Sequence, residues 1–436
     1  MPAKSIKENY VLKNVILADG SSADIQVVGD KISAIGSGLE AERQIDCSGL
    51  VALPGFVDLH THLREPGFEQ SETVLTGTQS AALGGFTAVH AMANTMPVAD
   101  TAGVVEQVAA LGKEAGYADV YPIGAVTVGL EGKQLAELGA MANSKAQVKV
   151  FSDDGKCVHD PVIMRRALEY VKTFGGVIAQ HAQEPRLTEG AQMNEGAVSA
   201  ELGLTGWPAV AEESIIARDV LLAEHVDSRL HICHLSTAGS VEIIRWAKAR
   251  GIKVTAEVTP HHLLLTDELA RTYDSVYKVN PPLRTQKDVE ALRAGLIDGT
   301  IDIIATDHAP HPIEAKDCEW NAAAFGMLGL EIAASVAQEV LIESGKSSWT
   351  RLAEVLSKNP AAIAGDLEQG QELKAGAVAN IVLIDPTTKR KVVADSASKS
   401  KNSPYVGLEL PGAVRHTIYR GYFTVEDSKL AEVGNN

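Results

Sequence analysis

Eight short apolar runs, separated by longer segments with helical spacing, constrain the fold of this chain more than any other feature. The candidate strands are residues 56–60, 87–91, 120–125, 147–151, 177–181, 229–234, 252–257 and 301–307. The helix-like segments between them include residues 73–83, 160–173, 211–225, 240–250 and 286–296. Strands that alternate with helices are typical of repeated βα units and a parallel sheet. Eight such units predict an α/β fold with a TIM-like (β/α)8 barrel, whose functional residues lie at the C-terminal ends of the strands.

The two ends of the chain have a different character. Strand-like runs separated by turn residues occupy 10–17, 24–28 and 31–35, and strand character returns at 380–385 and 414–421. A chain of 436 residues also exceeds the ~250–300 residues at which a single core usually stops growing. We therefore predict two domains, namely a barrel over residues 54–369 and a small β-sandwich domain formed by residues 1–53 together with 370–436.

The composition excludes several classes of partner. A formal net charge of −17 argues against a general binder of nucleic acid or membrane surfaces, because both need basic patches. The four cysteines form no CxxC pair, so they indicate neither a disulfide framework nor a zinc ribbon. No apolar run approaches the ~20 residues that span a bilayer, and the N-terminus has no apolar signal core. We expect a cytoplasmic protein that acts on a small molecule.

Histidine or aspartate follows five of the eight predicted strands. His60 and His62 end the first strand, and their spacing of two places both on one face. The later strand ends supply Asp153, Asp154, His181, His234 and Asp307. In a barrel these ends ring one mouth. Imidazole and carboxylate are ligands that zinc prefers, so four histidines and two aspartates predict a site for two metal ions with a shared carboxylate.

Five motifs in this chain resemble those of dihydroorotases of the longer bacterial type, in the amidohydrolase superfamily. They are FVDLHTHLREPG at 56–67, FSDDG at 151–155, HLST at 234–237, NPPLR at 280–284 and TDHAPH at 306–311. The resemblance extends from about residue 11 to 425. It implies a zinc-dependent cyclic amidohydrolase that interconverts N-carbamoyl-L-aspartate and (S)-dihydroorotate plus water, in de novo pyrimidine (UMP) biosynthesis.

The same resemblance implies two Zn²⁺ ions per chain, bridged by a carboxylate and a hydroxide. The implied ligands are, for one ion, His60, His62 and Asp307 and, for the other, His181 and His234. We choose Asp154 as the bridging carboxylate, because its separation from His181 matches the spacing in the family. Asp153 stays open as an alternative, and so does a carboxylated Lys149, because many relatives in the superfamily bridge their metals with a modified lysine on this strand.

Substrate contacts are implied in the same way. Arg64 lies two residues after His62, and its planar guanidinium can hold a carboxylate through two hydrogen bonds. By resemblance, Asn94 and His311 complete the contacts to the substrate carboxylate. The implied contacts to the ring amide are Asn280, Phe325 and Gly326. Asp307 is also expected to be catalytic, accepting the proton of the attacking hydroxide and passing it to the leaving ring nitrogen.

Two other functions compete with this one. A cyclic amidase of the hydantoinase or allantoinase type does not require an arginine directly after HxHL, so Arg64 together with Asn94 discriminates against it. An inactive dihydroorotase-like scaffold for aspartate transcarbamoylase is expected to have lost metal ligands, whereas every ligand position is filled here. An active enzyme can still associate with that transcarbamoylase, and a homodimer is equally compatible with the sequence. Residues 312–325 are expected to cover the mouth of the barrel, and residues 397–402 to form a surface loop.

Overall fold

A barrel of eight parallel strands forms the centre of the computed structural model, which describes residues 9–432. Its strands are β6 (Phe56–Thr61), β7 (Phe86–Ala91), β8 (Asp119–Pro122), β9 (Val150–Phe151), β10 (Val177–Gln180), β13 (Leu230–Ile232), β14 (Val254–Val258) and β15 (Ile303–Ile304). Strands β6 to β8 form one parallel sheet and the other five form a second. Isolated parallel bridges, Gly124 with Phe151 and Thr61 with His308, join the two sheets at both edges. The barrel predicted from the strand and helix alternation is confirmed.

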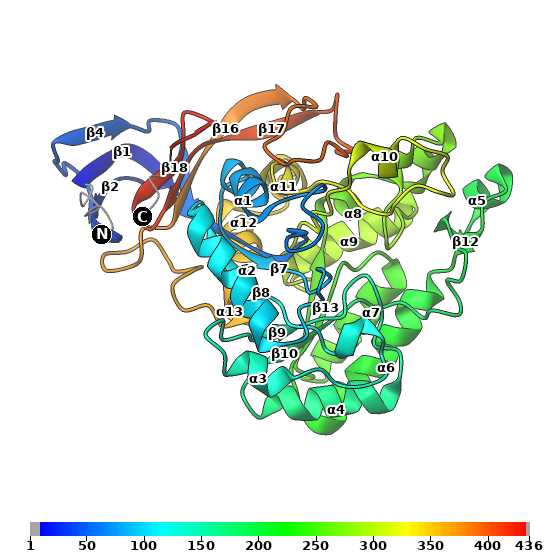
Figure 1. Cartoon of the computed structure of the whole chain (residues 1–436). Coiled ribbons are helices and arrows are strands. Elements are labelled where there is room, and N and C mark those ends of the chain that lie inside the picture. The colour runs from blue at the N-terminus through cyan, green and yellow to red at the C-terminus, as the bar shows by residue number, and fades with distance from the viewer. Residues whose placement is uncertain (1–8, 433–436) are drawn as a thin grey trace.

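At least one helix follows each barrel strand, and eight of these helices surround the barrel (Figure 1). They are α1 (Val74–Leu83), α2 (Ala102–Ala115), α3 (Leu138–Ala142), α4 (Pro161–Lys172), α6 (Val210–Val226), α7 (Ala238–Ala249), α9 (Gln286–Asp298) and α11 (Ala333–Gln338). Local sequence fixes several of their starts: the Asp160 side chain accepts hydrogen bonds from the first turn of α4, and Thr285 forms a capping box with Asp288 at the start of α9.

Shorter elements lie in the connections between the barrel strands and helices and after the last barrel strand. They are β11 (Met193–Asn194), α5 (Ala197–Leu202), β12 (Gly206–Trp207), α8 (Pro260–Leu264), α10 (Ile313–Lys316), α12 (Trp349–Ala353) and α13 (Asn359–Ala364). Two π-helical turns, Glu339–Glu343 and Glu354–Lys358, continue α11 and α12. Ile363 and Ala364 of α13 pack in one apolar cluster with strand residues such as Leu59, Ala179 and Ile303. The barrel interior is therefore a packed core, and functional side chains are confined to its mouth.

Strands from both ends of the chain form a separate, nine-stranded sheet outside the barrel. It contains β1 (Asn9–Leu17), β2 (Ser22–Val28), β3 (Lys31–Gly36), β4 (Arg43–Asp46), β5 (Val51–Pro54), β16 (Ile381–Lys391), β17 (Glu409–Tyr419), β18 (Tyr422–Glu426) and β19 (Lys429–Leu430). The two ends meet where β5 pairs antiparallel with β16, and in Figure 1 the blue and the orange strands accordingly lie together beside the barrel.

A separate apolar core, which includes Tyr10, Leu12, Ile381 and Phe423, packs in this sheet. The prediction that both chain ends build one β unit is confirmed. The domain boundaries 1–53, 54–369 and 370–436 stay a prediction, and residues 1–8 and 433–436, which include the N-terminal stretch examined for a signal core, lie outside the described residues.

The segment between β16 and β17 departs from expectation. Ser398, Ser400 and Asn402 are buried, with exposed fractions of 0%, 4% and 5%, whereas the alternate residues Lys399 and Lys401 are exposed. The expectation of a surface loop at 397–402 is therefore wrong for half of its residues. Its polar side chains are buried because they bind polar groups of neighbouring barrel loops, as buried polar groups generally must.

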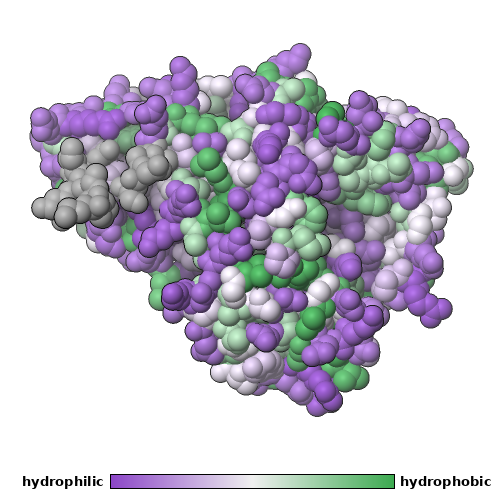
Figure 2. Space-filling model, in the orientation of Figure 1, coloured by the Kyte–Doolittle hydropathy of each residue, from purple (hydrophilic) through white to green (hydrophobic). Residues whose placement is uncertain are grey.

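Polar residues cover most of the surface on the face that Figure 2 shows. The apolar residues of this face lie in small scattered groups. Within residues 9–432, no helix has both the length and the apolar character needed to cross a membrane.

We predict that Leu383→Ala destabilises the protein by about 2–5 kcal/mol, the usual cost of truncating a buried leucine. Leu383 lies in β16 opposite Ala52 of β5 and is 0% exposed. Thermal melting followed by circular dichroism measures the effect. The matched control is Val393→Ala, at a side chain that is 64% exposed, for which we expect a change within about 0.5 kcal/mol. Equal melting temperatures for the two variants would contradict the role of this strand pair.

Candidate active site

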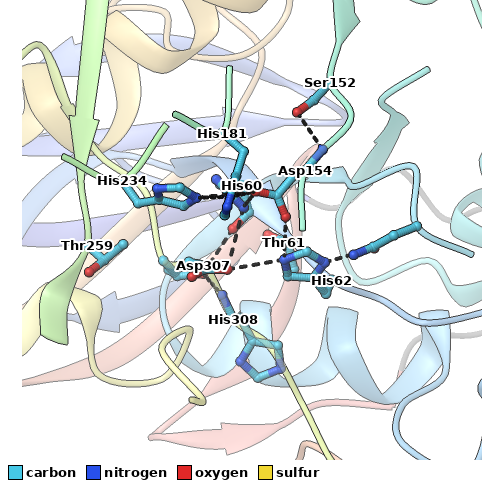
Figure 3. A network of polar contacts seen from close by, with 12 residues as sticks. His60, Thr61, His62, Ser152, Asp154, His181, His234, Thr259, Asp307 and His308 are labelled. Atoms are coloured by element: carbon cyan, nitrogen blue, oxygen red, sulfur yellow. Dashed lines mark hydrogen bonds and ion pairs between the residues drawn. The ribbon is translucent and has the colours of Figure 1, made fainter. Parts of the chain in front are cut away.

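Six side chains from five strand ends point toward one another at the mouth of the barrel (Figure 3). Strand β6 supplies two of them, and the segments after β9, β10, β13 and β15 supply one each. They are His60, His62, Asp154, His181, His234 and Asp307, and all six are at least 96% buried. The structure thus brings together every residue for which the sequence implied a metal-binding role.

The Asp154 carboxylate lies in the middle of the cluster. Its Oδ1 is 3.0 Å from His181 Nδ1, 3.2 Å from His234 Nε2 and 3.4 Å from His60 Nε2. Its Oδ2 is 3.2 Å from His62 Nε2. Burial opposes the charge of this carboxylate, but the opposite charge of His60 and hydrogen bonds from His181 and His234 hold the pKa of Asp154 well below its ordinary value.

The two alternatives to Asp154 face elsewhere. Asp153 Oδ1 accepts hydrogen bonds of 2.8 and 3.0 Å from the amides of Val126 and Thr127, and its Oδ2 accepts one from the Thr127 hydroxyl. Lys149 is exposed on the outside of the barrel wall. Of these three side chains, Asp154 is the one that faces the histidines.

Asp307, which follows β15, contacts both histidines of β6. Its Oδ1 is 3.1 Å from His62 Nε2 and 3.5 Å from His60 Nε2. Burial raises its pKa, but the charges of His60 and His62 outweigh burial and keep the pKa well below the ordinary range. The backbones of Asp307 and His234 have φ values of 44° and 30°, in the left-handed region that residues other than glycine rarely adopt. Such strain is typical of functional sites, where the surrounding structure maintains it.

Three of the histidines are oriented by acceptors on their outer side. His60 Nδ1 lies 2.6 Å from Glu257 Oε1, His62 Nδ1 lies 2.9 Å from Asn94 Oδ1, and His181 Nε2 lies 2.7 Å from Gln183 Oε1. Each acceptor favours a proton on the outer nitrogen, which leaves the inner nitrogen free to bind a cation.

Glu257 and Gln183 were not singled out from the sequence. Glu257 ends the seventh predicted strand, so its position fits the strand-end pattern, but that pattern is recognised by histidine and aspartate and not by glutamate. Besides His60, its carboxylate binds His231 Nε2 at 2.9 Å and the His234 amide at 3.1 Å. Burial opposes its charge, but His60 and His231 lower the pKa of Glu257 to about 2, so it is charged at neutral pH.

The residues of this cluster fit a metal centre. His60 Nε2 is buried and has no hydrogen-bond partner, and His181 Nδ1 lies 2.9 Å from His234 Nε2, a repulsive contact if neither nitrogen carries a proton. Ligand atoms lie within 4.8 Å of one another in two overlapping triplets, His60 with Asp154 and His234, and His60 with His62 and Asp307. Nitrogen and carboxylate donors in this number match the preferences of zinc.

Arg64 lies beside this centre, half-buried, with the φ value of 64° that turns the chain out of β6. Its Nε donates to Pro310 O at 3.2 Å. Burial lowers the pKa of Arg64 to about 10, which leaves the guanidinium charged at neutral pH. Within the described part of the chain it has no carboxylate partner: Glu65 and Glu69 accept hydrogen bonds from the amides of Val74 and Gly67 instead.

The other expected substrate contacts lie around Arg64 and the histidines. His311 Nε2 is 2.8 Å from Phe325 O and 3.4 Å from Arg64 Nη2. Asn280 donates to Gln183 Oε1 at 3.2 Å, while its own Oδ1 is buried without a partner. Gly326 packs against the ring of His311, and its amide donates to Lys278 O at 3.0 Å.

Asn94 differs from expectation in one respect. The sequence implies a substrate contact alone, whereas in the structure its Oδ1 also contacts His62 Nδ1, at 2.9 Å. The side chain therefore links a proposed metal ligand to the substrate side of the site.

Two buried lysines hold residues 312–325 in place: Lys278, outside the segment, and Lys316, within it. Lys278 Nζ donates to Trp320 O at 2.6 Å, and Lys316 Nζ donates to Lys278 O at 3.0 Å and to Ala324 O at 2.8 Å. These contacts hold the segment beside Asn280. Its movement over the mouth stays a prediction.

Known proteins similar to this chain are dihydroorotases by sequence and hydantoinases among solved structures. The family described as "Dihydro-orotase-like" matches residues 49–240. The chain is 67% identical to the dihydroorotase of Leifsonia xyli, over 98% of both chains, and 66% identical to that of Streptomyces coelicolor, over 96% of this chain and 99% of the other. Among solved structures, an L-hydantoinase (dihydropyrimidinase) from Arthrobacter aurescens superposes with a TM-score of 0.86 at 26% identity, over 97% of both chains.

We predict that Glu257→Gln weakens metal binding by about 10- to 100-fold, the usual effect of removing a carboxylate that orients a ligating histidine. The amide keeps the size of the side chain but loses the negative charge shared by His60 and His231. Metal content after dialysis against a graded series of chelator concentrations measures the change. Glu290→Gln, at an exposed position, is the matched control. An affinity equal to that of the control would show that Glu257 does not support the centre.

Proposed function

This chain belongs to the dihydroorotase family, and from that premise we propose how its residues interconvert N-carbamoyl-L-aspartate and dihydroorotate. One observation carries the proposal: a buried cluster of four histidines and two aspartates lies directly beside an arginine that has no carboxylate partner within residues 9–432. The cluster suits the cleavage of a cyclic amide, and the free guanidinium suits a substrate that bears a carboxylate.

We propose Zn²⁺ as the native metal, with two ions per chain. His60, His62 and Asp307 would hold one ion, His181 and His234 the other, and Asp154 would contact both, in keeping with its position among all four imidazoles. Bound zinc supplies Lewis-acid polarisation of a carbonyl and lowers the pKa of water.

Asp307 is proposed to move the proton. Its charge at neutral pH allows it to accept a proton from the attacking water, and the same group then donates that proton to the ring nitrogen as the amide bond breaks. Asp307 Oδ1 contacts His60 and His62, which places the carboxylate among the proposed metal ligands where the reaction would occur. Ring closure runs through the same steps in reverse.

Arg64, Asn94 and His311 are proposed to bind the substrate carboxylate, and Asn280 to bind the ring amide. The unpartnered Oδ1 of Asn280 supports this assignment, because a ring N–H would satisfy it. The backbone of Phe325 and Gly326 forms the adjacent wall. Hydantoin has no carboxylate, so Arg64 distinguishes this site from the hydantoinase alternative. The scaffold alternative is not favoured either, because all six candidate ligands converge.

The reaction of the family implies small-molecule substrates. A cytoplasmic location, a homodimer and an association with aspartate transcarbamoylase stay predictions. Size-exclusion chromatography with light scattering, with and without that transcarbamoylase, measures the last two directly.

Asp307→Asn is expected to lower kcat by about 10²–10⁴-fold, the range for loss of a general acid–base, while metal stays bound. The amide cannot accept the proton but retains an oxygen toward His62. Turnover and metal content are measured on the same preparation, with Asp395→Asn, at an exposed position, as the control. Activity within a few-fold of wild type would remove Asp307 as the proton carrier.

Arg64→Ala is expected to raise the KM for dihydroorotate by about 10- to 100-fold, because charge-assisted hydrogen bonds contribute about 1.5–3 kcal/mol. Metal content should not change, and any slow turnover of hydantoin should be unaffected, since hydantoin offers the guanidinium no carboxylate. Arg165→Ala, on the exposed face of α4, is the control. An unchanged KM for dihydroorotate would refute the carboxylate contact.

A further inference from the structure

The partly buried segment between β16 and β17 runs from the nine-stranded sheet to the loops at the barrel mouth. The Ser398 hydroxyl and the Lys399 amide donate to the carboxylate of Glu72, the latter at 2.9 Å. Ser400 Oγ donates to Ser71 O at 2.7 Å. Residues 71 and 72 lie in the loop that follows β6, the strand that carries two of the candidate metal ligands. The segment is thereby fixed across one side of the active site.

Asn402 ends this anchored stretch, and its side-chain amide is fully used. Its Oδ1 accepts a hydrogen bond from the His311 amide at 3.1 Å. Its Nδ2 donates to Ala309 O at 3.0 Å and to Gly326 O at 3.1 Å. One buried side chain thus connects two parts of the segment that follows β15, the turn at 309–311 and the backbone at 326.

Both connected parts of this segment carry proposed substrate contacts. Arg64 Nε binds Pro310 O from the side of the site, so the turn at 309–311 lies between Arg64 and Asn402. His311 binds Phe325 O through Nε2, and its ring packs so closely on Gly326 that a Cβ there would lie 2.7 Å from His311 Cδ2. A shift of either part of the segment would therefore move the His311 ring relative to Arg64.

We propose that Asn402 is a positioning residue of the substrate site, which holds His311 and Gly326 in place for the substrate carboxylate and ring. The inference rests on the substrate contacts proposed above. Asn402 acts through these residues, because every polar atom of its amide already has a protein partner in a buried place. Asn402 lies outside the predicted barrel segment 54–369, so the connection between β16 and β17 helps to position residues of the barrel mouth. Fixed placement of binding groups is what lowers the cost of ordering them when substrate binds.

The test uses the full-length, metal-loaded enzyme with Asn402→Ala, which removes all three side-chain hydrogen bonds, and Asn402→Asp, which removes the two donors. We expect the KM for dihydroorotate to rise about tenfold in each, with kcat within about twofold of wild type and unchanged metal content. Ser403→Ala is the neighbouring control, since its hydroxyl accepts only a long 3.5 Å hydrogen bond from Tyr405 N. Unchanged KM values overturn the proposal. Loss of metal, or an equal fall in kcat, also overturns it, because Asn402 would then support the centre or the fold.

A double-mutant cycle separates positioning from a general effect. In a His311→Ala background, Asn402→Ala should add less than about twofold to KM, because two residues that act through each other are not additive. If His311→Ala alone raises KM, the same tenfold rise from Asn402→Ala in both backgrounds overturns the proposal.

Hydrogen–deuterium exchange gives a readout that does not depend on the proposed substrate contacts. The His311 amide should exchange faster in Asn402→Ala than in wild type, because its acceptor is gone. Unchanged exchange overturns the positioning role whatever His311 does. If His311→Ala leaves KM unchanged while exchange at His311 is faster in Asn402→Ala, the substrate contact proposed for His311 fails and the positioning by Asn402 holds.

Discussion

A buried carboxylate among four imidazoles is the interaction on which the rest of this structure depends. Removing a charged carboxylate from water costs roughly several kcal/mol even after relaxation, and the cost is recovered only where opposite charge and hydrogen bonds surround it. Asp154 has such surroundings because four strand ends deliver their side chains to one point. A parallel barrel provides this convergence, since all its strands end at the same mouth.

The barrel alone does not determine how the histidines face the centre. Glu257, Asn94 and Gln183 bind the outer nitrogens of three of them and so direct the inner nitrogens toward Asp154 and Asp307. Two of these three side chains have a second partner. Glu257 also contacts His231, and Gln183 also accepts a hydrogen bond from Asn280. The orientation of the candidate metal ligands is therefore connected to Asn280, which is proposed to contact the substrate.

The fold and most of the site could be predicted from the sequence, because strand periodicity, helical spacing and strand-end residues are local features. The choice between Asp153 and Asp154 depended on family spacing, since adjacent residues in one motif look alike. The structure separates them through the amides of Val126 and Thr127, which bind Asp153 from another strand end. Asn402 gave no local indication at all. Its serine- and lysine-rich neighbourhood is typical of a surface loop, and its partners at 309, 311 and 326 lie far away in the chain.

The pairing of β5 with β16 affects the order in which this chain can fold during translation. During translation β5 leaves the ribosome long before β16 has been synthesised. The edge of β5 that pairs with β16 therefore stays exposed until then. The barrel strands, by contrast, pair mainly with strands close in sequence as they emerge. A nascent chain interrupted before β16 would hold a nearly complete barrel beside an unfinished sheet, which makes the N-terminal strands the part most exposed to aggregation before synthesis ends.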